Sequence, residues 1–304
     1  VLVENFRPGA LARQGLGYDD LSDAHPGLVY CSVSGFGQTG PRHSEPGYDA
    51  VLQAEGGLMS ITGPADGTPY RLGVAIADIV SGMFAAYGVA MALLVHARTG
   101  RGQLVDVAML DSVAALLTYQ AGIYFATGQA PARLGNRHPT IVPYETFAAS
   151  DGDMVVAVGN DALFRRFCEV IDRPALGEDA RFATNSGRIE HQETLRPLIA
   201  DRLRTRPRQQ WVEALKQAGV PCGAVRDLAQ VLSDPQLAER MMVLGMTHPT
   251  AGPIQVLGVP VKLGDTAGSV RTPPPTLGQH THAVLRELGY DANQIAALEL
   301  AEAI

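Results

Sequence analysis

Short apolar runs alternate with longer segments of helical periodicity in the first part of the chain. The runs VLVE (1–4), GLVYCSVS (28–35) and QLVDVAM (103–109) are bounded by polar residues or glycine, as is typical of buried strands. Helices are expected near residues 8–15, 18–24, 47–60, 78–98 and 109–127. Because strands and helices alternate, this pattern predicts an α/β domain.

The pattern changes at GQAPARLGNRHPTIVP, a loop rich in Gly, Pro and His. Beyond it, YETFAAS and MVVAVG flank an Asp-Gly turn and predict a β-hairpin. Amphipathic helices are expected near residues 161–172, 192–204 and 208–218. Short strands within residues 247–263, the linker TPPPTLGQ and a helix at 282–289 complete the chain. The second half therefore indicates a smaller α+β domain and a C-terminal segment.

The chain has 304 residues, which is long enough for a large core and for two domains. We assign the large domain to residues 1–127 and a linker with the small domain to 128–240. Residues 241–304 are expected to return to the large domain. Because the chain starts with VLVENF rather than with Met, we expect it to be a fragment whose first structural units are absent.

Charge and cysteine usage narrow the class of protein. A net charge of −7 argues against nucleic acid or a membrane surface as partner. Cys31, Cys168 and Cys222 are odd in number and show no C-x-x-C spacing. This usage favours the reducing cytoplasm over a disulfide framework or a zinc site, so we expect a cytoplasmic protein without a bound metal.

The segment Ile79 to Val95 contains 17 residues without a charge, so a membrane span has to be considered. The segment is rich in Ala and Gly and slightly shorter than a typical span of about 20 residues. The rest of the chain has the character of a soluble protein. A buried domain helix is therefore the favoured interpretation.

Three short motifs have a plain structural interpretation beside a chemical one. GFGQTG (35–40) matches G-x-G-x-x-G, but PRHSEPG follows it, which favours a tight glycine loop over a dinucleotide site. His280 and His282 lack the spacing of helical metal ligands and favour a surface cap. Cys222 in GVPCGAV has no His near it in sequence and is more typical of a structural thiol than of a nucleophile.

Asp78 stands alone as a carboxylate in the run RLGVAIADIVSGMFAA. One interpretation is an N-cap, because Asp is among the best N-cap residues and the uncharged helix begins here. A second interpretation is a nucleophile, because the residues on the same helix face leave room for a ligand. These small residues are Ser81, Gly82, Ala85 and Ala86. The helix dipole keeps such a carboxylate ionised, so capping does not exclude the second role.

Several longer motifs then resemble one family. They are VLVENFRPGAL, LVYCSVSGFGQTGP, GYDAVLQAEGGLMSITG, GVAIADIVSGMFAA, RTGRGQLVDVAMLDS, GNRHPTIVPYETFAASDG, GVPCGAV and PPPTLGQHT. In this order they resemble the class III (CaiB/BaiF) CoA-transferase family. The resemblance implies a Rossmann-like large domain, a smaller α+β domain and an interlocked homodimer. It also implies coenzyme A thioesters and small carboxylic acids as substrates, with no tightly bound cofactor.

The resemblance assigns roles to individual residues. The residue aligned with Asp78 is the family's nucleophile, which forms a mixed anhydride and then an aspartyl-CoA thioester. Family residues aligned with Asn5, Phe6, Arg7 and Arg13 contact CoA, whereas a strand-to-helix turn with surface arginines is the plain alternative. Tyr48 and Asp49 align with residues of the pocket beside the thioester.

Two other functions remain as alternatives. The α-methylacyl-CoA racemase branch resembles the chain but has a His where this chain has Tyr48. Racemisation needs an acid or base on each face of the α-carbon, and a tyrosine with a reference pKa near 10 is a poor base. Transfer is therefore favoured over racemisation. A non-catalytic CoA-binding subunit is the other alternative, and turnover of an acyl-CoA would discriminate.

The segment GNRHPTIVPYETF resembles transferases of the succinate-hydroxymethylglutarate type, which implies succinyl-CoA and a dicarboxylic acid as substrates. The second carboxylate of such an acid needs a cation or several donors in the site. Arg137 and His138 are the candidates, followed by Arg71. The plain alternative is a turn in which Arg137 is solvated and His138 packs against its neighbours.

Overall fold

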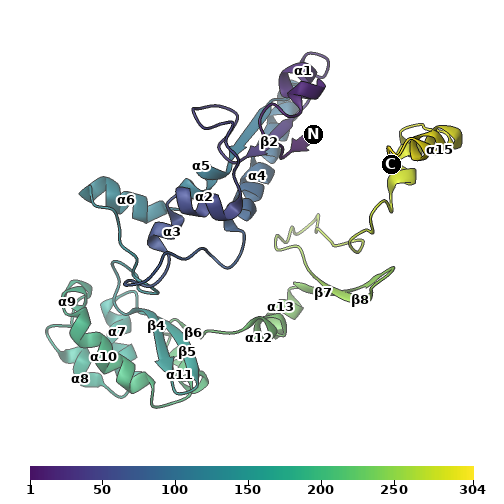
Figure 1. Ribbon diagram of the computed structural model, residues 1–304. Coiled ribbons are helices and arrows are strands. Elements are labelled where there is room, and N and C mark those ends of the chain that lie inside the picture. Colours follow the sequence, from purple (N-terminus) through teal and green to yellow (C-terminus); the bar gives the residue numbers. More distant parts are fainter. The chain divides into compact units, whose positions relative to one another are not determined.

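The computed structural model describes residues 1–304, which divide into two compact units, Val1–Ala224 and Val225–Ile304. Figure 1 labels the elements along the chain. The first unit begins with β1 (Leu2–Glu4), η1 (Ala12–Gln14), α1 (Tyr18–Ser22), β2 (Tyr30–Ser34), α2 (Asp49–Glu55), α3 (Leu58–Ile61), α4 (Ile76–Thr99), β3 (Leu104–Ala108), α5 (Met109–Ala115) and α6 (Thr118–Thr127). It continues with β4 (Tyr144–Ala149), β5 (Gly152–Ala157), α7 (Asp161–Val170), α8 (Pro174–Glu178), α9 (Asn185–Glu190), α10 (Gln192–Leu203), α11 (Arg208–Gln217) and β6 (Cys222–Ala224). The second unit contains α12 (Leu228–Leu232), α13 (Pro235–Glu239), β7 (Val243–His248), β8 (Gly252–Leu257), α14 (Thr281–Glu287) and α15 (Ala292–Leu300).

The three strands predicted in residues 1–127 form one parallel sheet in the order β1-β2-β3. Cys31 of β2 and Val107 of β3 pack with Ala85 of α4 in a small core on one face of this sheet. A second core joins Leu52 of α2 to Val113 of α5. The mixed α/β architecture predicted from the alternating pattern is thereby confirmed.

Two predicted helices are each interrupted. The helix expected at 47–60 breaks into α2 and α3 at Gly56 and Gly57, where Gly57 has φ +83° and a Cβ on Gly56 would lie 2.5 Å from Val113. The helix expected at 109–127 breaks into α5 and α6 before Thr118, which has φ 42°. Left-handed backbone stops a right-handed helix, and the periodicity of the apolar residues does not register such a break.

The helix α4 exposes much of its apolar surface. It has the length and composition of a membrane span, and 22% of its most apolar window is buried. The core helices of soluble proteins can have the same length and composition, so these two properties do not by themselves identify a membrane span. The large apolar side chains that α4 exposes are Ile79, Met83, Phe84, Tyr87, Met91, Leu93, Leu94 and Val95. Apolar surface of this extent on one helix indicates a contact surface.

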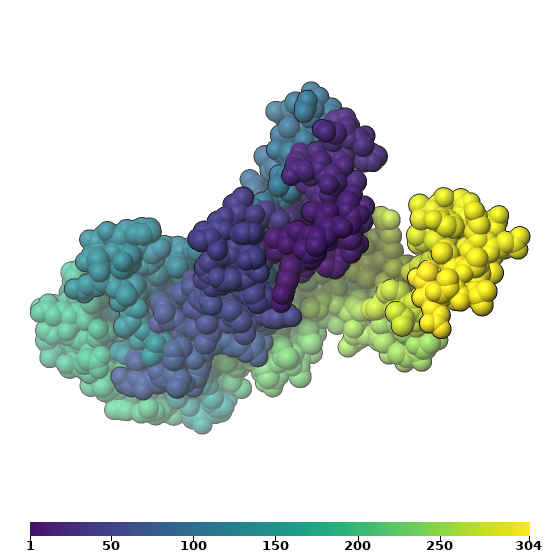
Figure 2. All heavy atoms as spheres, turned by 45° about the horizontal axis from the view of Figure 1, so that its top comes forward, coloured from purple at the N-terminus to yellow at the C-terminus, as the bar shows by residue number.

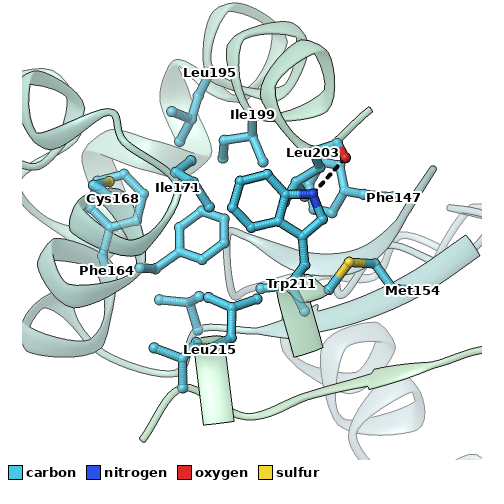
Figure 3. Packing of buried hydrophobic residues seen from close by; sticks show 14 of the residues in the cluster. Phe147, Met154, Phe164, Cys168, Ile171, Leu195, Ile199, Leu203, Trp211 and Leu215 are labelled. Carbon is cyan, nitrogen blue, oxygen red and sulfur yellow. Dashed lines mark hydrogen bonds between the residues drawn. The ribbon is translucent and has the colours of Figure 1, made fainter. Parts of the chain in front are cut away.

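The predicted hairpin is confirmed as β4 and β5, which pair antiparallel and are joined by β6 in a three-stranded sheet. Helices pack on this sheet around Trp211, whose Nε1 donates a hydrogen bond to the Leu203 carbonyl oxygen at 2.7 Å (Figure 3). Fully buried side chains of this core each contribute about 1.5–3 kcal/mol by burial. Cys168 is buried in this core and Cys222 lies half-buried on β6; both are free thiols. Because β6 has three residues, its sequence carries too short a pattern to predict a strand.

Arg188 on α9 is a buried anchor of the same core region. Its side chain is fully buried, and its Nε donates to the Val142 carbonyl oxygen at 2.6 Å. The two Nη atoms donate to the Phe182 carbonyl oxygen at 3.0 Å and to Asp161 at 2.9 Å. The guanidinium also lies 4.5 Å from the centre of the Phe164 ring. Arg188 thereby joins the segment before β4 to α7 and α9.

The second unit contains the antiparallel hairpin β7–β8 and a pair of helices at the end of the chain. His282 on α14 contacts Glu299 on α15 at 2.8 Å, and Ile295 is buried. Figure 2 shows the atoms of this terminal segment, in yellow, gathered in one body. His280 occupies the N-cap position of α14, although its side chain makes no capping hydrogen bond. His280 therefore precedes the first turn of α14, whereas His282 lies within α14 and contacts α15.

Candidate active site

A cleft of about 280 Å³ lies at the carboxyl ends of the three parallel strands. Asn5 follows β1, Ser34 ends β2 and Met109 follows β3. The cleft is lined by Asn5, Phe6, Arg7, Pro8, Ser34, Gly35, Glu45, Pro46, Gly47, Tyr48, Asp78 and Met109. Parallel α/β sheets bind ligands at this edge, so its position supports a binding site.

Asp78 is the third residue of α4 and lines the cleft. The N-cap position belongs to Ala75, so the interpretation of Asp78 as the N-cap is wrong. The small residues on its helix face divide into two sets. Ser81 and Ala85 are buried, whereas Gly82 is exposed and would place a Cβ in open space. A ligand therefore has room beside Asp78 on the side of Gly82.

Asp49 on α2 provides the carboxylate that caps α4. Its Oδ1 accepts a hydrogen bond from the Ala77 N–H at 2.9 Å, and its Oδ2 accepts from Gln53 Nε2 at 2.8 Å. Gln53 is fully buried, and its Oε1 accepts from the Leu72 N–H at 2.8 Å. This network attaches the segment that leads into α4 to α2 and so fixes the position of Asp78. Asp49, predicted as a pocket residue, supports the nucleophile candidate without lining the cleft.

The surroundings of Asp78 make its carboxylate more basic than usual. Although the side chain stays exposed, partial loss of water raises the pKa of Asp78, and the negative charge of Asp49 raises the pKa further. A carboxylate is nucleophilic only when it is ionised, so the interpretation of Asp78 as a nucleophile predicts that activity falls as the pH drops through this raised pKa. A more basic carboxylate is also the better nucleophile once it is ionised.

Asp49→Asn is expected to shift the acidic limb of the plot of kcat/KM against pH to lower pH. The substitution removes the like charge, and the pKa of Asp78 falls, while the amide oxygen still accepts from the Ala77 N–H. Glu45, Tyr48 and Arg7, the other titratable groups lining the cleft, are unchanged. Asp49→Ala is the matched control, since it also removes the cap and should cost about 1 kcal/mol of stability. A limb that stays at its wild-type pH in Asp49→Asn would contradict this electrostatic role.

Four of the sequence-predicted substrate residues line the cleft with Asp78. They are Asn5, Phe6, Arg7 and Tyr48. Asn5 Nδ2 donates to the Val33 carbonyl oxygen at 2.7 Å and ties the end of β1 to β2. Tyr48 is 77% exposed. Arg7 lies between this cleft and a neighbouring hollow of about 360 Å³ and borders both.

The remaining candidates lie elsewhere. Arg13 belongs to η1 and does not line the cleft; Arg71 is exposed and donates to the Leu72 carbonyl oxygen at 3.4 Å. Arg137 pairs with the largely exposed Glu193 at 3.2 Å. The His138 ring lies 5.6 Å from the Tyr119 ring and 5.1 Å from the Tyr144 ring. Neither Arg137 nor His138 lines the cleft of its own chain.

The sequence interpretation missed several cleft residues, including Glu45, Ser34 and Met109. Ser34 and Met109 lie at the carboxyl ends of predicted strands, so the position rule for parallel sheets would have found them. The glycine loop after β2 was predicted correctly. Gly37 and Gly40 have φ of +87° and +90°, and no helix begins before α2.

Comparisons with known proteins show which proteins this chain is similar to. The sequence model of CoA-transferase family III matches residues 1–281. A succinyl-CoA:glutarate CoA-transferase of Mus musculus is 40% identical over 300 residues, which cover 98% of this chain and 69% of the relative. A succinate–glutarate CoA-transferase of Agrobacterium fabrum is 38% identical over 95% of this chain and 72% of its own length. The crystal structure of a CaiB/BaiF family protein from Brucella suis superposes with a TM-score of 0.82 at 38% identity, covering 94% of this chain and 74% of that one.

Proposed function

Because this chain belongs to CoA-transferase family III and is a CoA-transferase, we propose that it moves coenzyme A from succinyl-CoA to a free dicarboxylic acid through Asp78. The observation that carries the proposal is the position of the Asp78 carboxylate in a cleft with Asn5, Arg7 and Tyr48. Arg7 is suited to the phosphates of CoA, because a guanidinium binds phosphate oxygens through two parallel hydrogen bonds. The names of the mouse and Agrobacterium relatives support succinate and glutarate as the acids.

In the proposed reaction, a carboxylate oxygen of Asp78 attacks the thioester carbonyl carbon of succinyl-CoA. The carbon–sulfur bond breaks, CoA leaves as a thiolate, and a succinyl-aspartyl anhydride remains. The thiolate then attacks the Asp78 carbonyl carbon of the anhydride, which releases succinate and leaves an aspartyl-CoA thioester. The acceptor acid repeats these steps in reverse and regenerates the Asp78 carboxylate.

No proton has to move in these steps, because in each of them a carboxylate or the CoA thiolate attacks and a thiolate or carboxylate leaves. A thiolate with a thiol pKa near 8.5 is a good leaving group, so the protein contributes chiefly by positioning the reacting groups. The network of Asp49 and Gln53 provides such positioning for Asp78. The raised pKa of Asp78 increases its basicity for the attack.

A panel of acceptor acids tests this function directly. The protein is incubated with succinyl-CoA and, separately, glutarate, oxalate or butyrate, and the mass of each new thioester is measured. The proposal predicts new thioesters from dicarboxylic acids and little from butyrate. Absence of any new thioester from all acids would reject it.

We further propose that two copies of the chain form a homodimer through α4. Met83 and Tyr87 are 67% and 66% exposed and, four positions apart, lie on one face of α4. Such a dimer interface accounts for the long apolar surface of α4 without contact with a membrane.

Tyr87→Asp is expected to convert this dimer to a monomer, because a carboxylate loses its hydration when an apolar interface closes. The molar mass from light scattering at micromolar concentration is the measurement. Leu228→Asp is the matched control, since Leu228 is 79% exposed on α12 outside the proposed interface. A wild-type protein that remains monomeric under these conditions would contradict the dimer.

The role of Arg137 and His138 in selecting dicarboxylic acids stays a prediction. Because neither residue lines the cleft of its own chain, their participation requires a movement of the loop or the loop of a second copy. The pair of Arg137 with Glu193 is a surface pair worth about 0–1 kcal/mol, so releasing Arg137 costs little. Arg137→Ala is expected to raise KM for succinate and glutarate about tenfold while KM for butyrate changes little. Equal changes for both kinds of acid would show that the loop only supports the fold.

A further inference from the structure

Arg42 forms an ion pair with Glu45, which lies in the wall of the cleft. Arg42 Nε and Nη2 donate to Glu45 Oε2 at 2.9 and 2.6 Å, and Nη2 also contacts the Glu55 carboxylate. Glu45 lines the cleft, whereas Arg42 does not. Both side chains are roughly half exposed, so the pair adds little to stability, and its effect is expected in ligand binding instead.

The position of Arg42 is restricted from three sides. Its guanidinium carbon lies 4.1 Å from the centre of the Phe36 ring, and Phe36 is buried in the core that contains Leu52. The two carboxylates lie on different segments, with Glu45 in the loop before α2 and Glu55 at the end of α2. A planar guanidinium held by a ring and two acceptors has little freedom to leave. Arg42 thereby closes the loop of residues 37–47 onto α2.

The charges of the cleft explain why this pair bears on binding. The charged side chains that line it are Arg7, Glu45 and Asp78. The acyl-CoA and the dicarboxylic acid of the proposed function are anions, so an unbalanced carboxylate in the wall repels them. Hydrogen bonds from Arg42 lower the pKa of Glu45 and keep it ionised. Its charge therefore has to be balanced by a cation, and Arg42 is the cation in contact with it.

We propose that Arg42 is a positioning residue of the cleft, which holds the Glu45 carboxylate in the wall and balances its charge so that anionic acyl-CoA binds. The inference rests on the proposed function only in taking CoA as the ligand. It adds a determinant of affinity that is separate from Asp78, because neither Arg42 nor Glu45 takes part in the chemical steps.

Binding of CoA, measured by calorimetry at low salt, tests the proposal with Arg42→Gln, Glu45→Gln and the double variant. Arg42→Gln is expected to weaken CoA binding about tenfold, since an unbalanced carboxylate then faces the ligand. The double variant is expected to return to within about threefold of wild type, because loss of the Glu45 carboxylate offsets loss of the Arg42 cation and the net charge beside the cleft is unchanged. These differences should shrink at high salt. Arg181→Gln is the control, because Arg181 pairs with Asp179 outside the cleft. This variant should bind CoA with wild-type affinity.

Arg42→Gln with wild-type affinity, or a double variant as weak as Arg42→Gln alone, would overturn the proposal. If Arg42→Gln does not fold, Glu45→Gln decides: the cleft wall loses one negative charge while Arg42 stays paired with Glu55, which should tighten CoA binding about twofold or more at low salt. Unchanged affinity in that variant also overturns the proposal. A wild-type protein that does not bind CoA would overturn the proposed function itself, which distinguishes the two failures.

Discussion

Asp78→Ala is expected to reduce CoA transfer to below about 1% of wild type, because the substitution removes the carboxylate that the proposed mechanism joins first to the acyl group and then to CoA. The fold should be retained, since Asp78 makes no capping hydrogen bond and Asp49 caps α4 instead. Initial rates of thioester exchange with succinyl-CoA are the measurement. Circular dichroism and thermal unfolding verify that the variant is folded.

Asp111→Ala is the matched control for this experiment. Asp111 is likewise an exposed carboxylate in the first turn of a helix, α5, but it does not line the cleft. Its replacement should leave the rate near wild type and cost at most about 0.3–1 kcal/mol of stability. An Asp78→Ala variant that retains more than a few per cent of turnover would contradict nucleophilic catalysis by Asp78.

The covalent intermediate offers an independent readout of the same mechanism. Incubation with succinyl-CoA alone should add the mass of CoA to the intact protein at Asp78, and borohydride should reduce the thioester there. Asp78→Asn should show neither product. An active enzyme without any label would favour direct transfer between the two bound substrates.

Arg188→Met is expected to lower the free energy of unfolding of the region that contains it by about 3–5 kcal/mol. The substitution removes a fully buried guanidinium and leaves the carbonyl oxygens of Val142 and Phe182 without their donor. Urea unfolding followed by the fluorescence of Trp211 is a suitable measurement, since Trp211 lies buried in the same core. Arg188→Lys should recover part of the loss, because an ammonium group cannot reach all three acceptors in a planar fork.

Arg181→Met provides the matched control for Arg188. Arg181 also pairs with a carboxylate, Asp179, and its guanidinium lies 5.0 Å from the Phe182 ring, but its side chain is 54% exposed. Surface ion pairs contribute about 0–1 kcal/mol, so this control should unfold near the wild-type urea concentration. Equal losses for the two variants would show that burial of Arg188 does not determine its contribution.

Local sequence patterns were sufficient to predict most strands but not the positions at which helices break. Apolar runs in β1, β2 and β3, and the Asp-Gly turn between β4 and β5, are local features, so the structure confirmed them. The break between α2 and α3 depends on the close approach of Gly56 to Val113, which is far away in the sequence. An amphipathic period continues through such a break because it records which residues are buried and not the backbone dihedral angles.

The sequence by itself determined the α/β class, the hairpin of the second sheet and Asp78 as the carboxylate to examine, because each depends on neighbouring residues or on a motif. Only the tertiary structure decided that Asp49 caps α4, that Arg7 and Tyr48 reach the cleft of Asp78, and that Arg137 and His138 do not line it. Asp49 and Ala77 are 28 positions apart, and Arg42 meets Glu55 across 13 positions. Hydrogen bonds between such distant positions produce no periodic pattern in the sequence, because the partners come together only after the strands and helices have packed.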